Sequence, residues 1–375
     1  MKFEVLSSDL TSHLNAISRV LASKNAMPIL DNFLFQVTDT KLVITASDGD
    51  TTMVTSLPTS NVEGTGSFVV PAKTIMDPLK EMPQQQLTLE VDNGNYEVIV
   101  SYLNGKYHFI GGNAAEYPIL KELEEGAQRF EINPQSLLNG IQSTLFATAE
   151  DDLRPVMNGI YFDIKDSQVT FVASDSKKLV RLINTATDPG FTGSFILPKK
   201  PATLLKNVIT KDQLLCTVSF DSKSARFQLG DYELSCRLID GRYPRYEAVI
   251  PKNNTNRLTI DRQSFLSSLR RIAVFSNSAT NQVKFELEAT ALTISAQDVD
   301  FSTSGTETLA CSYDGNPMSI GFRANFLIEI LNTMQATDVE MLLSDPARAG
   351  LVTPVQNNEG EDLLMLIMPM MLTDF

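Results

Sequence analysis

The 375-residue sequence predicts an α+β fold of three similar domains, each made of two repeats. One repeat is a strand and a helix followed by about three strands. Two observations support this prediction: a short apolar strand that leads into a helix recurs six times at near-constant spacing, and every second repeat has a strand that ends in aspartate. The length also favours two or three domains, because single hydrophobic cores seldom grow this large.

The repeat is clearest where the apolar strand 195–197 meets Pro198, a residue that the first turn of a helix tolerates. The six strands begin at Phe3, Phe68, Phe130, Phe195, Leu258 and Ile320. Their separations are 65, 62, 65, 63 and 62 residues. The chain therefore has an internal period of about 63 residues, as expected for a repeated architecture.

Apolar spacing and turn residues predict the elements in order. The first repeat has a helix at 8–24 and strands near 33–37, 42–46 and 52–57. The second has a helix at 71–82 and strands near 87–91, 96–101 and 106–110, with Asn-Gly chemistry at the hairpin turns. The remaining helices are predicted at 134–147, 198–211, 261–275 and 323–335.

Polar, loop-like joins near 122–128 and 251–256 separate pairs of repeats. They predict domains at 1–125, 126–252 and 253–375. In each domain the third strand of the first repeat ends in an aspartate, namely Asp48, Asp175 and Asp298. Acid chemistry would need such carboxylates paired in one cleft. We interpret them instead as turn caps at strand ends.

Composition excludes several classes of protein. Three cysteines without C-x-x-C spacing indicate neither a disulfide framework nor a zinc site, and we expect no metal and no cofactor. The N-terminus reads as a strand and not as a signal peptide. The longest apolar run, 363–372, is broken by Pro369 and is too short to span a bilayer. We expect a cytoplasmic, soluble protein.

Charge is distributed unevenly, although the net charge of −14 argues against an ordinary DNA-binding protein. The predicted helices carry 12 basic and 5 acidic residues, or 12 − 5 = +7, and the remainder carries 19 − 40 = −21. The basic residues are Arg19, Lys24, Lys73, Lys80, Lys199, Lys200, Lys206, Lys211, Arg262, Arg270, Arg271 and Arg323. If the helices share one face, that face attracts a polyanion.

Helix geometry limits what such a face can enclose. Axes of packed helices lie about 8 to 10 Å apart, so six helices closed in a ring leave a hole of only about 9 Å. Twelve helices leave about 28 Å, which is wide enough for a DNA duplex. Two chains in a closed C2 ring could encircle DNA, whereas one chain could not.

Several stretches make the chain similar to the bacterial DNA polymerase III β subunit family, the replicative sliding clamps. The matching stretches, in order, are 1–3, 28–32, 70–73, 158–159, 172–175, 240–244 and 368–370. The resemblance implies a DNA clamp: a homodimeric ring with helices inside and antiparallel sheets outside. Such a ring encircles duplex DNA without reading sequence, is not an enzyme, and tethers DNA polymerase III, the clamp loader and repair proteins.

The resemblance also implies three sets of site residues. The residues that meet DNA are Lys24, Lys73, Arg154, Lys199 and Lys200. The pocket for partner peptides is formed by Met157, Ser174, Ser176, Lys177, Lys178, Leu179, Pro244, Ala248, Val249, Leu366, Ile367, Met368, Pro369 and Met370. The dimer interface places Val274 and Phe275 against Tyr107 and Phe109.

The chain departs from the family pattern in three places. Ser176-Lys177-Lys178-Leu179 stands where the family often has Gly-His-Arg-Leu, Pro155 and Val156 replace aromatic residues, and the chain continues beyond the usual end through 373–375. Two alternatives remain from the residues alone. One is a hydrolase with a carboxylate pair at Asp48 and Asp50 or at Asp298 and Asp300, and the other is a monomeric β-rich ligand-binding scaffold. The lack of phosphate-loop, nucleophile-elbow and metal-ligand motifs disfavours an enzyme.

Overall fold

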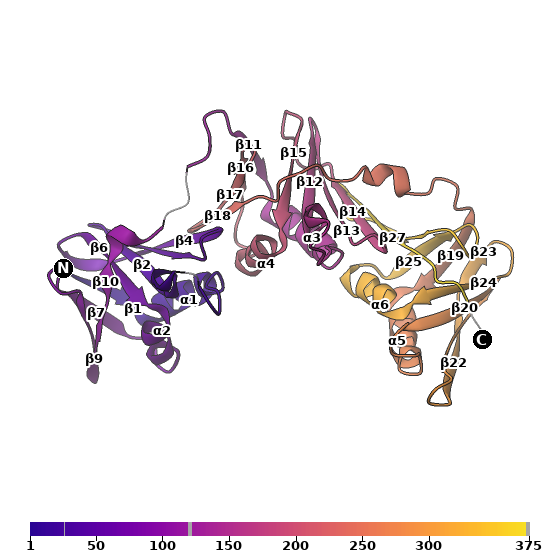
Figure 1. Ribbon diagram of the computed structural model, residues 1–375, viewed down its shortest axis with the longest axis horizontal. Coiled ribbons are helices and arrows are strands. Elements are labelled where there is room, and N and C mark those ends of the chain that lie inside the picture. The colour runs from indigo at the N-terminus through magenta and orange to yellow at the C-terminus, as the bar shows by residue number, and fades with distance from the viewer. Residues whose placement is uncertain (26, 119–121, 373–375) are drawn as a thin grey trace. The chain divides into compact units, whose positions relative to one another are not determined.

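The computed structural model describes residues 1–25, 27–118 and 122–372 (Figure 1). The chain divides into two compact bodies. The first body comprises Met1–Leu138 with Lys200–Leu238, and the second comprises Asn139–Lys199 with Ile239–Phe375. The additional residues 373–375 lie outside the described part of the chain. None of the described helices combines the length and apolarity that crossing a membrane requires.

All six predicted strand–helix junctions are present. The leading strands are β1 (Lys2–Leu6), β6 (Gly66–Pro71), β11 (Gln128–Ile132), β15 (Gly193–Pro198), β19 (Asn256–Asp261) and β24 (Met318–Arg323). The helices that follow them are α1 (Ser7–Ser18), α2 (Ala72–Lys80), α3 (Pro134–Leu145), α4 (Lys199–Val208), α5 (Arg262–Ala273) and α6 (Ala324–Thr333). Pro198 and Pro71 end their strands and do not occupy the first helical turn, so that detail of the prediction is wrong.

Three strands follow each helix, as predicted. They are β2 (Asn32–Val37), β3 (Lys41–Ser47), β4 (Thr51–Pro58), β7 (Gln86–Val91), β8 (Glu97–Tyr102), β9 (Gly105–Ile110), β12 (Gly159–Lys165), β13 (Gln168–Ser174), β14 (Lys178–Asn184), β16 (Cys216–Phe220), β17 (Ser224–Leu229), β18 (Tyr232–Arg237), β20 (Gln282–Glu288), β21 (Ala291–Asp298), β22 (Thr303–Ala310), β25 (Asp338–Leu343), β26 (Gly350–Pro354) and β27 (Glu361–Ile367). Shorter elements are β5 (Ser60–Glu63), β10 (Gly112–Asn113), β23 (Ser312–Asp314), η1 (Pro28–Asp31), η2 (Ala114–Glu116), η3 (Pro155–Met157) and η4 (Tyr246–Val249).

Paired repeats interlock by exchanging their leading strands. In the first body β1 pairs with β7 of the next repeat, while β6 pairs with β2 of the preceding one. The same exchange joins β11 to β16 and β15 to β12, and then β19 to β25 and β24 to β20. A single repeat therefore cannot complete a sheet, which explains why the repeats occur in pairs.

Each body contains two antiparallel sheets. The sheets of the first body have the orders β5-β1-β7-β8-β9 and β10-β6-β2-β3-β4-β18-β17-β16-β11. Those of the second body have the orders β15-β12-β13-β14-β27-β26-β25-β19-β23 and β22-β21-β20-β24. Helix α1 packs against α2 and contacts strands of both sheets in the first body, and α5 packs against α6 in the second (Figure 1). The helices thus pack their apolar faces against the apolar faces of the sheets.

The helices are shorter than predicted, and α1 shows why. Apolar spacing continues through Val20 and Leu21, but their amides bond to residues three positions back, which tightens and ends the helix. The carbonyl freed at Val20 accepts a hydrogen bond of 2.6 Å from Lys200 Nζ. A lysine remote in the sequence therefore supplies the cap that the local residues lack.

The three strand-end aspartates form the same turn cap, which confirms the interpretation. Asp48 Oδ1 accepts the Asp50 and Thr51 amides at 2.9 and 2.7 Å. Asp175 Oδ1 accepts the amides two and three residues later, both at 2.9 Å, and Asp298 Oδ1 does the same at 3.0 and 3.3 Å. These carboxylates fix hairpin geometry after a strand.

His13 joins α1 to the seam between β4 and β18. Its Nδ1 lies 2.6 Å from Thr55 Oγ1, and its ring stacks on Tyr232 with the centroids 5.4 Å apart. Burial lowers the pKa of His13, and this effect outweighs the opposing influence of Asp231 and Asp9. The folded protein therefore holds the ring neutral at pH values where an exposed histidine begins to protonate.

A pH dependence of stability follows from this depressed pKa. Below the ordinary histidine pKa of about 6.5 the unfolded chain binds the proton more tightly than the folded chain, so stability falls as the pH drops. We expect the His13→Gln variant to lose this component. The measurement is the difference in urea midpoint between wild type and variant from pH 8 to pH 5. A difference that does not change with pH would contradict the assignment.

Candidate functional site

The second body contains an apolar cavity of about 230 Å³. Its walls come from η3, the turn between β13 and β14, the segment that includes η4, and the end of β27. The lining residues are Met157, Ser174, Ser176, Lys178, Leu179, Tyr243, Pro244, Arg245, Tyr246, Val249, Leu366 and Met368. Four segments distant in sequence thus form one concave surface, which is the usual form of a ligand site.

The β13–β14 turn forms one wall of the cavity and is held rigidly. Ser174 Oγ donates to the Lys178 carbonyl at 2.9 Å and accepts the Ser176 amide at 3.1 Å. Ser176 has a φ of +72°, a left-handed conformation that these bonds stabilise. The Met368 amide bonds the Lys177 carbonyl at 3.1 Å, which brings the chain after β27 against this turn.

Lys178 is buried behind that wall, with only 6% of its side chain exposed. Its Nζ lies 2.9 Å from Asp175 Oδ2 and 3.3 Å from Glu329 Oε2. It also lies 4.2 Å from the centroid of the Phe326 ring on α6. The charge is therefore neutralised by Asp175 of the turn and by Glu329 of α6, as a buried ammonium requires, and Lys178 connects the cavity wall to that helix.

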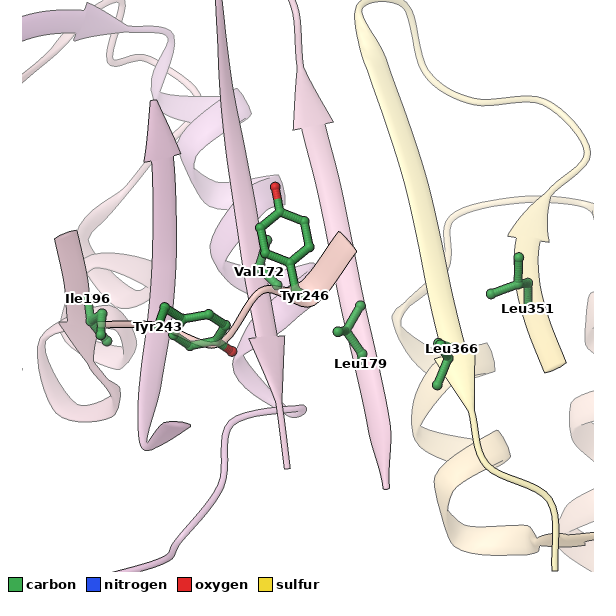
Figure 2. Packing of buried hydrophobic residues seen from close by; sticks show 7 residues of the cluster. All are labelled: Val172, Leu179, Ile196, Tyr243, Tyr246, Leu351 and Leu366. Carbon is green, nitrogen blue, oxygen red and sulfur yellow. The ribbon is translucent and has the colours of Figure 1, made fainter. Parts of the chain in front are cut away.

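Tyrosines form the opposite wall. Tyr243 stacks on Tyr161 of β12 with the centroids 4.7 Å apart, and Tyr246 donates to Asp163 Oδ2 at 2.8 Å. Figure 2 shows both rings within the cluster that contains Leu179 and Leu366 on neighbouring strands β14 and β27. Burial raises the pKa of Tyr246, and its bond to Asp163 raises it further. Both tyrosines thus remain protonated hydrogen-bond donors at neutral pH.

The structure brings together most, but not all, of the expected pocket residues. Those that do not line the cavity are Lys177, Ala248, Ile367, Pro369 and Met370. Ile367 is buried on the opposite face of β27, because successive strand residues alternate. Met370 bonds to Gly321 of β24 through its amide at 2.8 Å.

Three cavity residues were missed from the sequence: Tyr243, Arg245 and Tyr246. They lie on either side of Pro244 in a short segment. The stretch 240–244, which resembles the family, was the feature of the sequence that indicated this segment. The aromatic spacing around the proline could have identified the two tyrosines. Nothing in the local sequence indicates that Arg245 borders a cavity, because the other walls come from distant segments.

The five residues expected to meet DNA divide between the bodies. Lys24, Lys73 and Lys200 belong to the first body, and Arg154 and Lys199 belong to the second. Lys24 and Lys73 are exposed. Lys200 is held by Asp48 and by the carbonyl at the end of α1.

The two cations of the second body already bind acidic residues. Lys199 contacts Glu150 at 2.5 Å, and Arg154 contacts Asp151 at 2.8 Å and Ser176 at 2.6 Å. Hydrogen bonding to these cations lowers the pKa of both carboxyls. Any phosphate that approached would have to compete with a carboxylate, so these contacts would be weak.

Charge on the observed helices keeps the predicted sign. The six helices contain 8 Lys or Arg and 3 Asp or Glu residues, so they carry 8 − 3 = +5. The rest of the chain carries 23 − 42 = −19. The excess is smaller than predicted, because the shorter helices exclude Arg19, Lys24, Lys211 and Arg323.

The described sheets are open, so each ends in strands that are paired on one side only; these include β9 in the first body and β22 in the second. Tyr107 and Phe109 lie half-buried on β9. Phe275, at the end of α5, lies against Gly305 of β22, where an added Cβ would sit 2.5 Å from its ring. The neighbouring Val274 is 78% exposed.

Comparison with known proteins identifies the family. Three models of the DNA polymerase III beta subunit match the chain in order: the N-terminal domain over residues 1–121, the central domain over 131–245 and the C-terminal domain over 247–371. The chain belongs to the DNA polymerase III beta subunit family. The Beta sliding clamp of Synechococcus elongatus is 28% identical over 95% of this chain and 96% of its own length.

Solved sliding clamps share the fold. The DNA polymerase sliding clamp from Pseudomonas aeruginosa, solved with a ligand, is 25% identical and covers 99% of this chain and 100% of its own, with a TM-score of 0.92. The beta subunit from Streptococcus pyogenes reaches 0.93 at 22% identity, with 99% and 100% coverage. The three-domain clamp fold predicted from the sequence is therefore confirmed.

Membership of the beta subunit family identifies this chain as a DNA sliding clamp, a processivity factor and not an enzyme. The hydrolase alternative is wrong, because the chain belongs to a family of sliding clamps. Asp48 and Asp298 cap turns, and Asp50 lies 3.3 Å from Arg237 in an ion pair. The sliding clamp thus uses the carboxylates of Asp48 and Asp298 to shape its hairpins.

Proposed function

We propose that two copies of this sliding clamp associate head to tail into a ring that encircles duplex DNA and tethers the replicative polymerase. The observation that carries this proposal is that two of the strands that end sheets, β9 in one body and β22 in the other, have exposed apolar residues on or beside them. Strand edges with exposed apolar residues attract further strands, and natural proteins cover them. Pairing β9 of one copy with β22 of the next would satisfy both edges and close a twofold ring.

Apolar side chains near these edges support the same interface. Ile110 on β9 is 56% exposed, and Val299 and Phe301, before β22, are each 76% exposed. Burying such residues supplies the main driving force for association. We assign Tyr107, Phe109, Val274 and Phe275 to this interface.

We assign DNA attraction to Lys24, Lys73, Arg154, Lys199 and Lys200. Electrostatic attraction to phosphates does not depend on base sequence and weakens with salt. The carboxylate partners of Lys199, Lys200 and Arg154 keep each contact weak, which suits a protein that slides. Retention on DNA would come from the closed ring.

We assign partner binding to the apolar cavity of the second body. Its walls include Met157 and Met368, whose flexible side chains adapt to different ligands. A peptide that buries leucine and phenylalanine there gains about 1.5 to 3 kcal/mol per side chain. Such peptides would come from DNA polymerase III, the clamp loader and other replication and repair proteins. We expect the clamp and these partner proteins to lie in the cytoplasm.

We further propose domain boundaries at 1–125, 126–252 and 253–375. The exchange of leading strands supports them, because each domain then holds two interlocked repeats. The nine-stranded sheets cross these boundaries where β4 meets β18 and where β14 meets β27. Continuous sheets thus connect successive domains.

The test is retention on circular DNA. After loading by a clamp loader, we expect the protein to remain on a nicked circle during gel filtration at about 0.5 M salt, where exposed electrostatic contacts are screened. Cutting the circle once should release it. The proposed ring would be contradicted if the protein stayed bound to the linear DNA. It would also be contradicted if the protein left the uncut circle as fast as it leaves the linear DNA.

A further inference from the structure

The charged side chains that line the partner cavity are both cationic. Lys178 and Arg245 lie in its wall, and no aspartate or glutamate does. The hydroxyls of Ser174 and Ser176 are already engaged. In a chain with a net charge of −14, the lining of this cavity thus contains positively charged side chains and no negatively charged ones. Its chemistry favours a ligand that brings acceptors and negative charge.

Arg245 provides the available charge at this site. Lys178 is compensated by Asp175 and Glu329, so its charge is not free for a ligand. Arg245 is exposed at the rim, and no carboxylate of the described residues lies within ion-pairing distance of it. A guanidinium in this position can bind a carboxylate through two parallel hydrogen bonds.

Tyr243 contributes its ring to the cavity, and not its hydroxyl. The side chain is only 7% exposed, its hydroxyl oxygen is buried, and the Ser174 backbone lies close to it. Figure 2 shows the hydroxyl end of the ring directed away from Ile196, towards the strand that carries Val172. Arg245 is therefore the charged group that a ligand in the cavity can reach.

We propose that this cavity selects acidic peptides, in which an aspartate or glutamate next to the apolar anchors pairs with Arg245. The inference rests on the proposed partner-binding role of the cavity and adds a rule for which partners bind well. Arg245 is thus a specificity-determining residue, and the apolar walls supply the affinity common to all partners.

Three fluorescent peptides test the proposal. They share the leucine and phenylalanine anchors and differ only at the adjacent position, which is Glu, Gln or Lys. Fluorescence anisotropy at about 0.05 M salt would give their dissociation constants. For an exposed ion pair we expect wild type to bind the Glu peptide about fivefold more tightly than the Gln peptide, with the Lys peptide weakest. The preference should shrink as salt increases.

Charge reversal provides the decisive comparison. Arg245→Glu should invert the order and favour the Lys peptide, while Arg242→Glu, an exposed neighbour outside the cavity wall, should retain the order of wild type. The thermal midpoint of each variant shows whether it is folded.

The outcomes separate this inference from the function on which it rests. If wild type binds all three peptides equally, or if Arg245→Glu keeps the preference for Glu, the acidic selectivity is wrong and the cavity remains a peptide site. If wild type binds none of them, the peptide-binding assignment itself fails.

Discussion

Replacing Phe275 by arginine is expected to dissociate the proposed dimer, weakening self-association at least about 100-fold. Phe275 is 36% exposed and lies against Gly305 on the unmatched edge strand β22. In the proposed interface the arginine would bury a charge without a partner, which costs several kcal/mol. Sedimentation equilibrium at micromolar protein should give the mass of one chain for the variant and of two for wild type.

The same variant should not be retained on closed circular DNA, because a monomer cannot enclose the duplex. Leu214→Arg provides a matched control, since Leu214 is also an exposed apolar residue but precedes β16, whose sheet contains neither β9 nor β22. We expect this control to remain dimeric. A Phe275→Arg protein that keeps the wild-type mass would exclude the interface assigned here.

Truncating Val249 and Met368 together to alanine is expected to weaken clamp-peptide binding about 30-fold. Both side chains stand at the lip of the cavity, 60% and 43% exposed, so removing them should leave the fold intact. Each truncation removes apolar contact worth about 1 kcal/mol, and about 1.4 kcal/mol corresponds to a tenfold change in affinity. Fluorescence anisotropy with a peptide that carries leucine and phenylalanine measures the effect.

A control with the same residue types tests whether the effect is local. Val355 and Met371 are 52% and 86% exposed and lie outside the cavity wall. Their double replacement by alanine should leave peptide affinity within about twofold of wild type. Normal affinity in the Val249 and Met368 variant would place the peptide elsewhere, whereas equal losses in both variants would indicate a general effect on the fold.

The cavity shows where inference from the sequence reaches its limit. The segments containing Met157, Leu179 and Met368 were found through resemblance, and the structure places these residues on one surface. The sequence does not show which side of β27 faces the cavity. Ile367 was therefore included among the expected pocket residues, although it is buried in the core. Arg245 was missed, because its position beside the cavity depends on packing between segments that are distant in sequence.

The sequence by itself determined the repeated strand–helix junctions, the hairpins and the turn caps at Asp48, Asp175 and Asp298. These features depend on residues only a few positions apart, so apolar spacing and turn chemistry reveal them. The excess of positive charge on the helices could be read for the same reason. Local patterns were therefore sufficient for the elements and for their order.

Only the tertiary structure decided how these elements combine. The exchange of leading strands joins residues about one repeat apart, and the end of α1 depends on Lys200, 180 positions beyond Val20. The tertiary structure also decided that Lys199 and Arg154 are paired with carboxylates. Such contacts form because distant segments gain burial and hydrogen bonds together, and no short stretch of sequence records that gain.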